Sequence, residues 1–125
     1  MSTRKYLLDE HVNPRLKRAV HQRNPEIVVW CIGDPGAPTR GTLDPDILLW
    51  CEAKGFSLVT NNRTSMPVHL REHLAAGRHV PGIFILNDKM SMGQTAEELA
   101  LIWGATEPDE YVNLIKFLPV SFRLS

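Results

Sequence analysis

The amino-acid sequence predicts a single α/β domain over residues 1–125, with a small, mostly parallel sheet of about five strands and helices on both faces. Short runs of β-branched and aromatic residues alternate with segments of helical length, an alternation typical of right-handed β-α-β crossovers. Proline and glycine stand at the junctions between these segments. The hydrophobic fraction of 43% and the charged fraction of 22% are those of an ordinary globular domain.

The first part of the chain predicts a strand, a helix and a second strand. Residues 5–8 form a short apolar run, and Asn13 with Pro14 then predicts an N-cap and a first helical residue. The helix is expected to end near Arg23, before an Asn-Pro pair. Residues 27–32 are almost continuously apolar, which predicts a strand covered on both faces of a parallel sheet.

A glycine- and proline-rich loop, residues 33–43, precedes the second predicted helix. Asp44 is the expected N-cap of this helix, with Pro45 at its first position. Gly55 stands where a left-handed residue ends such a helix. A third strand is predicted over residues 56–60.

The remaining segments complete the alternation. After a polar loop, Pro67 opens a helix that runs to about Ala76, and Ser91 with Gln94 has the spacing of a capping box for a helix ending at Gly104. The last two strands are predicted over residues 82–86 and 114–118.

Fourteen basic residues balance fourteen acidic residues, so the chain lacks the bulk positive charge of most duplex-DNA-binding domains. Any contact with nucleic acid is therefore expected to be local. The two cysteines, Cys31 and Cys51, lie in apolar runs and are interpreted as buried thiols. The three tryptophans also lie in apolar contexts and are expected in the core. Neither a signal peptide nor a membrane span is predicted, and a cytoplasmic location is expected by default.

Acidic and amide side chains follow the predicted strands at the ends where the crossovers begin. Asp9 and Glu10 follow the first strand, Asp44 follows the second, and Asn61 and Asn62 follow the third. Because parallel strands end at the same edge, these side chains are expected on one rim of the sheet, where open α/β folds bind ligands. Converging carboxylates favour Mg²⁺ or Mn²⁺, which can activate water for attack on a phosphate. In the simpler alternative, Asp44 only caps its helix and Asp9 only closes a turn.

The same stretches resemble the PIN-like domain family of unknown function, which is related to PIN-domain toxin ribonucleases. The resemblance is carried by YLLDEH (6–11), DPDILLW (44–50), LVTNNRTSM (58–66), AGRHVPGIF (76–84) and IKFLP (115–119). It spans nearly the whole chain, and the order and spacing of the stretches make it more specific than any one of them. It implies a PIN-like fold and, in active relatives, metal-dependent cleavage of RNA.

The resemblance also implies roles for individual residues. Asp9, Asp44 and Asn62 fall on the acidic catalytic positions of the family, and with Glu10 they are the candidate ligands of Mg²⁺ or Mn²⁺. Apart from the resemblance, Arg63 is the candidate contact to RNA because its positive charge lies in the loop next to Asn62, and its neighbours Thr60 and Asn61 are candidates with it.

One part of the family pattern is altered. Where relatives carry Thr-x-Asp or Thr-x-Asp-x-Asp, this chain has Thr60-x-Asn62-x-Thr64. An amide oxygen can bind Mg²⁺ but brings no negative charge, so metal affinity and water activation are expected to fall.

Three hypotheses about function follow. The first is a metal-dependent endoribonuclease with a degenerate acidic site. The second is a catalytically weak or inactive PIN-like domain that binds RNA or a protein partner such as an antitoxin. The third is a structural subunit in which exposed apolar residues form a homodimer.

Residues 69–73 match the His-x-x-Glu-His pattern of one class of zinc peptidases. A peptidase site needs a third protein ligand, and the sequence suggests none. The match is interpreted as accidental, with His69 and His73 expected to face solvent.

Overall fold

The computed structural model describes residues 4–120 and confirms the predicted α/β architecture. Its sheet has five parallel strands in the order β2-β1-β3-β4-β5. The strands are β1 (Lys5–Leu8), β2 (Val28–Cys31), β3 (Phe56–Thr60), β4 (Ile83–Ile85) and β5 (Ile115–Phe117).

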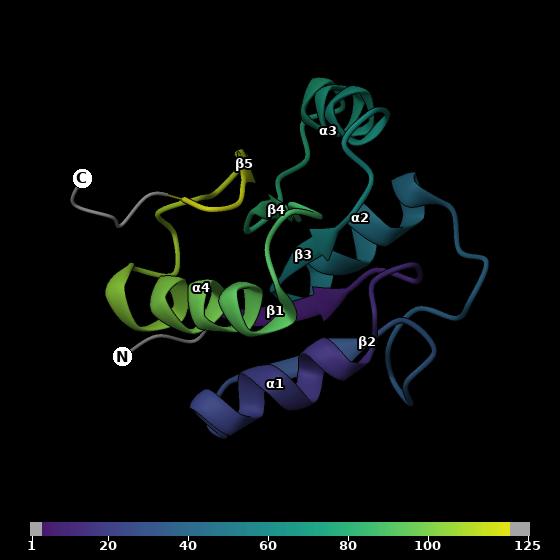
Figure 1. Ribbon diagram of the computed structural model, residues 1–125. Helices are drawn as coiled ribbons and strands as arrows, with labels where there is room; N and C mark the ends of the chain where they lie inside the picture. The colour runs from purple at the N-terminus through teal and green to yellow at the C-terminus, as the bar shows by residue number, and fades with distance from the viewer. Residues whose placement is uncertain (1–3, 121–125) are drawn as a thin grey trace.

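In the described part of the chain, four helices cover the two faces of the sheet. They are α1 (Arg15–Arg23), α2 (Asp44–Lys54), α3 (Met66–Ala75) and α4 (Met92–Ala105). Helices α1 and α4 pack together on one face, and α2 and α3 lie on the other (Figure 1). Within residues 4–120, no helix has both the length and the hydrophobicity needed to cross a membrane.

Each face of the sheet has its own hydrophobic core. Alternate residues of β1 and β3 serve opposite faces, as the pleat of a strand requires. Tyr6, Leu8 and Val59 join the core under α1 and α4, whereas Leu7 and Leu58 join the core under α2 and α3. This alternation also decides on which side of the sheet the polar residues at the strand ends lie.

Several local predictions are confirmed. Gly55 ends α2 with a φ of 76° in the left-handed region. Ser91 and Gln94 form both hydrogen bonds of a capping box at the start of α4. The N-cap of α1 is Pro14 and not Asn13 as predicted, because the helix begins one residue later than expected, although Asn13 accepts a hydrogen bond from the Arg15 backbone N–H.

Two predictions about burial need correction. Strand β2 lies at an edge of the sheet and is covered only in part: Val29 joins one core and Trp30 packs against the other, but Val28 is 38% exposed. Cys51 is buried as predicted, but Cys31 on the same edge strand is only partly buried. Continuous hydrophobicity indicated a strand correctly, yet it did not show that β2 has a neighbour on one side only.

The strand order reverses direction between β1 and β3. From β1 the chain adds β2 on one side, and it then crosses to add β3, β4 and β5 on the other. A crevice forms at such a switch point outside the carboxyl ends of the two strands, where α/β folds commonly bind ligands. In this chain Asp9 and Asn61 directly follow the two strands in question.

Candidate functional site

The pairing of β1 with β3 brings Asp9 and Thr60 together. Leu8 pairs with Val59, so the residues that follow them are also neighbours, and the Asp9 backbone N–H donates to the Val59 carbonyl. Both side chains lie on the side of the sheet that α2 covers. There the negative charge of Asp9 raises the pKa of the Cys51 thiol, which burial has already raised more strongly.

The Asp9 carboxylate is held by two donors. The Thr60 hydroxyl donates to Oδ2 at 2.7 Å, and the Glu10 backbone N–H donates to Oδ1 at 2.8 Å. Thr60 is fully buried, and its Oγ1 also accepts the Asn62 backbone N–H at 3.0 Å. One hydroxyl therefore links the end of β1 to the loop after β3.

The Asn62 side chain binds Asp44 through its nitrogen. Its Nδ2 donates to Asp44 Oδ2 at 2.9 Å, and its Oδ1 accepts the Ser65 backbone N–H at 3.0 Å. A backbone N–H can only donate, so the amide oxygen must face Ser65 and the amide nitrogen must face Asp44. His69 Nε2 lies 3.6 Å from the same Asp44 oxygen.

Asp44 does not cap its helix. The N-cap of α2 is Leu43, without a side-chain hydrogen bond, and Asp44 is the first helical residue. Its carboxylate is instead turned to Asn62 and His69. The simpler alternative, in which Asp44 is only a helix cap, is therefore wrong.

The predicted metal ligands do not form an oxygen cage in this arrangement. Mg²⁺ and Mn²⁺ need several oxygen atoms that point at one place. Asn62 points a nitrogen, not an oxygen, at Asp44, and Glu10 is turned to the Gly41 backbone N–H, which it accepts at 2.8 Å. In the part of the chain that the structure describes, no three His, Cys, Asp or Glu residues are grouped to hold a metal ion. As arranged, the four residues do not fit a divalent cation.

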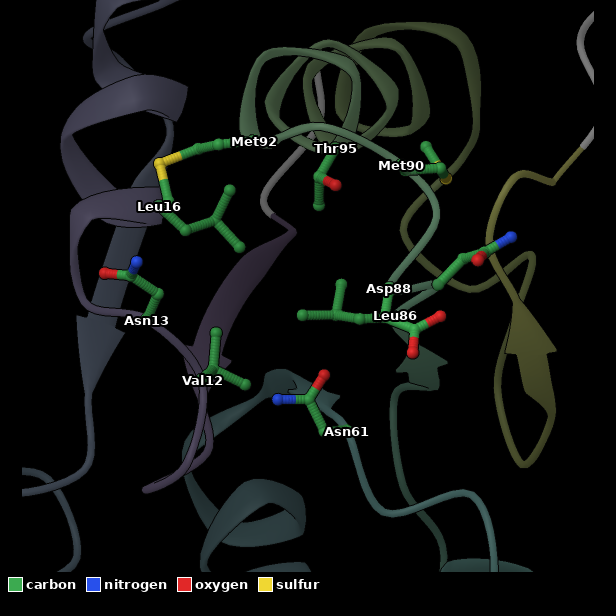
Figure 2. Close-up of a pocket in the computed structure, with 10 residues that line it drawn as sticks. Val12, Asn13, Leu16, Asn61, Leu86, Asp88, Met90, Met92 and Thr95 are labelled. Atoms are coloured by element: carbon green, nitrogen blue, oxygen red, sulfur yellow. The ribbon is translucent and has the colours of Figure 1, made fainter.

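Asn61 and Asn62, which are adjacent in the chain, lie on opposite sides of the sheet. The Asn61 Nδ2 donates to the His11 carbonyl at 3.2 Å, and its side chain lines a pocket under α1 and α4 (Figure 2). The sequence predicts both amides on one rim but does not show that they serve two recesses. Both residues lie beyond the end of β3, so the alternation of side chains along the strand does not by itself place them.

Arg63 lies beside an aromatic residue that the sequence analysis did not single out. Its guanidinium carbon is 6.0 Å from the centre of the Phe117 ring, and its Nη2 donates to the Leu86 carbonyl at 3.3 Å. Phe117 is 52% exposed. Because Thr60 pairs with Ile85 and Ile85 with Phe117, this pair lies along the same carboxyl edge as Asp9.

The two histidines of the His-x-x-Glu-His pattern were expected to face solvent, and this expectation is wrong. His73 is buried, and its Nε2 lies 3.0 Å from the His79 carbonyl and 3.1 Å from Glu52 Oε1. Arg78 also contacts Glu52, at 3.1 Å. This group joins α2 to the end of α3 and has the character of a structural link.

The chain matches no family model, no curated protein and no solved structure.

Proposed function

We propose that this chain is a PIN-like domain that binds single-stranded RNA along the carboxyl edge of its sheet and does not hydrolyse it. The observation that carries the proposal is the pairing of Arg63 with the half-exposed ring of Phe117. Exposed aromatic rings beside arginine are the usual platform on which proteins stack unpaired bases.

The position of the pair supports RNA over a purely structural role. Burial of Phe117 would stabilise the fold, yet half of this side chain remains in water. Arg63 is held over the ring by the Leu86 carbonyl, so its charge stays at the edge where ligands of α/β folds bind. A zero net charge is compatible with local binding of a few nucleotides.

The arrangement of Asn62 and Asp44 favours binding without cleavage. Phosphodiester hydrolysis by a metal-activated water needs carboxylates that are free to bind the cation. Here the nitrogen of the Asn62 amide donates to Asp44, so a neutral donor from the chain lies where an acidic neighbour would share a cation with this carboxylate. This arrangement favours a scaffold that binds RNA without cleaving it.

The test is titration of a fluorescently labelled single-stranded RNA octamer with the purified protein, followed by anisotropy in EDTA. Base stacking on an aromatic side chain contributes about 1–3 kcal/mol, so Phe117→Ala should weaken binding by about fivefold or more. Arg63→Ala should weaken it as well. The matched controls are Leu101→Ala and Arg18→Ala, which change an exposed apolar and an exposed basic residue on α4 and α1.

The second part of the test adds Mn²⁺ and follows the length of the RNA on a denaturing gel. Intact RNA in the presence of bound protein is the expected result. Mn²⁺-dependent cleavage that Asp9→Asn abolishes would establish the nuclease hypothesis instead. Absence of RNA binding, or equal losses in Phe117→Ala and Leu101→Ala, would overturn the proposal.

A further inference from the structure

A second recess opens at the carboxyl edge, on the side of the sheet opposite to Asp9 and Asp44. It is a cavity of about 190 Å³ between the ends of β1, β3 and β4 and the helices α1 and α4 (Figure 2). Its walls combine apolar side chains with amides; the lining residues are Val12, Asn13, Leu16, Asn61, Leu86, Asn87, Asp88, Met90, Met92 and Thr95.

The hydrogen bonds within the protein orient two of the amides. Asn61 gives its nitrogen to the His11 carbonyl, so its oxygen is left for the cavity, into which it points in Figure 2. Asn13 gives its oxygen to the Arg15 backbone N–H, so its nitrogen is left as a donor. The cavity therefore offers a hydrogen-bond acceptor from Asn61 and a donor from Asn13, both at its solvent-exposed rim.

The loop after β4 supplies further polar groups. Asn87 lines the cavity and uses its oxygen to accept the Lys89 backbone N–H. Asp88 is exposed at the mouth and adds negative charge. A phosphate group inside the cavity would be disfavoured by this carboxylate, whereas a neutral base with an amino group is not.

The apolar walls suit a flat ring. Met90 and Met92 flank the cavity from either side in Figure 2, and Val12, Leu16 and Leu86 complete the walls. Methionine side chains are flexible and polarisable, and they adapt to aromatic surfaces. Pockets for drug-sized ligands are usually about 300–1,000 Å³, so this cavity has room for one small ring system only.

We propose that this cavity binds one base of an unpaired RNA strand, adenine or cytosine, whose Watson–Crick edge carries an exocyclic amino group beside an unprotonated ring nitrogen. The Asn61 oxygen accepts a hydrogen bond from the exocyclic amino group, and the amide nitrogen of Asn13 donates to the ring nitrogen. Uracil presents a carbonyl oxygen where cytosine has its amino group, so it leaves the Asn61 oxygen without a donor. Amide side chains pair with adenine edges in this way in other complexes.

This proposal rests on the proposed RNA binding and adds a preference for particular bases. Leu86 connects the two features, because its side chain lines the cavity and its carbonyl accepts the hydrogen bond from Arg63. An RNA molecule with one base stacked on Phe117 can place another of its bases in the cavity. The first feature provides affinity for any base, and the second distinguishes bases.

The experiment is NMR of protein labelled at the methionine methyl groups, titrated with adenosine, cytidine or uridine. The expected result is that adenosine and cytidine shift the Met90 and Met92 signals and that uridine does so only weakly. The Met66 signal is the internal control, because Met66 is fully buried in the core on the other face. Asn61→Leu should remove the preference, whereas Gln22→Leu, which also replaces an exposed amide by leucine but lies on α1, should retain it.

Binding of three labelled RNA octamers, made of adenosine, cytidine or uridine nucleotides only, separates the proposed base pocket from the proposed RNA binding. The adenine and cytosine octamers should bind about fivefold more tightly than the uracil octamer, and Asn61→Leu should bring the affinities together. Equal affinities for all three octamers, unchanged in Asn61→Leu, would overturn the base pocket and leave RNA binding on Phe117 intact. If no octamer binds but adenosine still shifts Met90 and Met92, the cavity is a nucleoside site and the proposed function fails. Equal methyl shifts with adenosine and uridine would also overturn the base preference.

Discussion

The Asn62 amide donates a hydrogen bond from Nδ2 to Asp44 Oδ2 across 2.9 Å, and this contact distinguishes the site from a metal centre. A carboxylate at position 62 would face Asp44 with a second negative charge, and a cation would then be needed between them. The amide removes this need because its nitrogen is itself the donor.

This contact predicts the behaviour of Asn62→Asp. Without metal, the variant should lose roughly 2 kcal/mol of stability at pH 7, because a hydrogen bond to a charged group is replaced by repulsion. With Mg²⁺ or Mn²⁺, stability should recover and calorimetry should detect saturable binding that the wild type lacks. The control is Asn61→Asp, whose side chain lies on the other side of the sheet. Equal metal binding by both variants would contradict the prediction.

The buried Thr60 hydroxyl predicts a cost for Thr60→Val. The replacement keeps the shape but leaves Asp9 Oδ2 without a donor and the Asn62 backbone N–H without an acceptor. A loss of about 1–3 kcal/mol in the free energy of unfolding is expected, measured by urea denaturation. Thr64→Val, at an exposed position of the same loop, should change stability little. Similar values for the two variants would show that the hydroxyl does not link β1 to the loop.

Asp34 predicts a pH dependence of stability. The hydrogen bond from the Cys31 backbone N–H, 2.8 Å long, lowers the pKa of the Asp34 carboxyl, and Lys17 adds to this against the opposing effect of partial burial. A lowered pKa in the folded state stabilises the protein above the ordinary aspartate pKa, and this contribution disappears as the pH falls through the folded-state value.

The check is urea denaturation of the wild type and of Asp34→Asn at pH 7 and at about pH 2.5, where carboxylates are largely protonated. The wild type should be the more stable of the two at pH 7, and the difference should shrink in acid. A difference that stays constant with pH would refute the assignment to charge.

The buried His73 predicts a loss of stability in His73→Leu. The ring nitrogen Nε2 faces two oxygen acceptors, so it carries a hydrogen, and leucine would leave the His79 carbonyl and Glu52 without it. The expected cost is about 1–3 kcal/mol. His73→Gln, which keeps an N–H donor, should cost less. If glutamine were no better than leucine, packing alone would explain the effect.

Much of the fold could be predicted from local patterns. The strands differ from their predicted bounds by one or two residues at most, because short apolar runs between turn residues have few other conformations. Gly55 and the Ser91–Gln94 pair behave as predicted because a helix end is satisfied by residues a few positions away. These features depend on the chain only within a turn or two.

The site depended on contacts that local patterns do not contain. Asp44 was expected to cap its own helix, yet its carboxylate meets Asn62, which comes from the loop after another strand. Glu10 was expected among the metal ligands, yet it binds the Gly41 backbone. A polar side chain has several partners within reach, and the choice among them depends on how distant segments pack.

By itself, the sequence determined the alternation of strands and helices and the edge at which Asp9, Asp44 and Asn62 gather. The tertiary structure decided that Asn61 and Asn62 serve opposite sides of the sheet and that Phe117 lies beside Arg63. The physical reason is the distance along the chain over which each interaction acts. Hydrophobic periodicity and capping act between near neighbours in the chain, whereas the register of β1, β3, β4 and β5 sets which distant side chains meet.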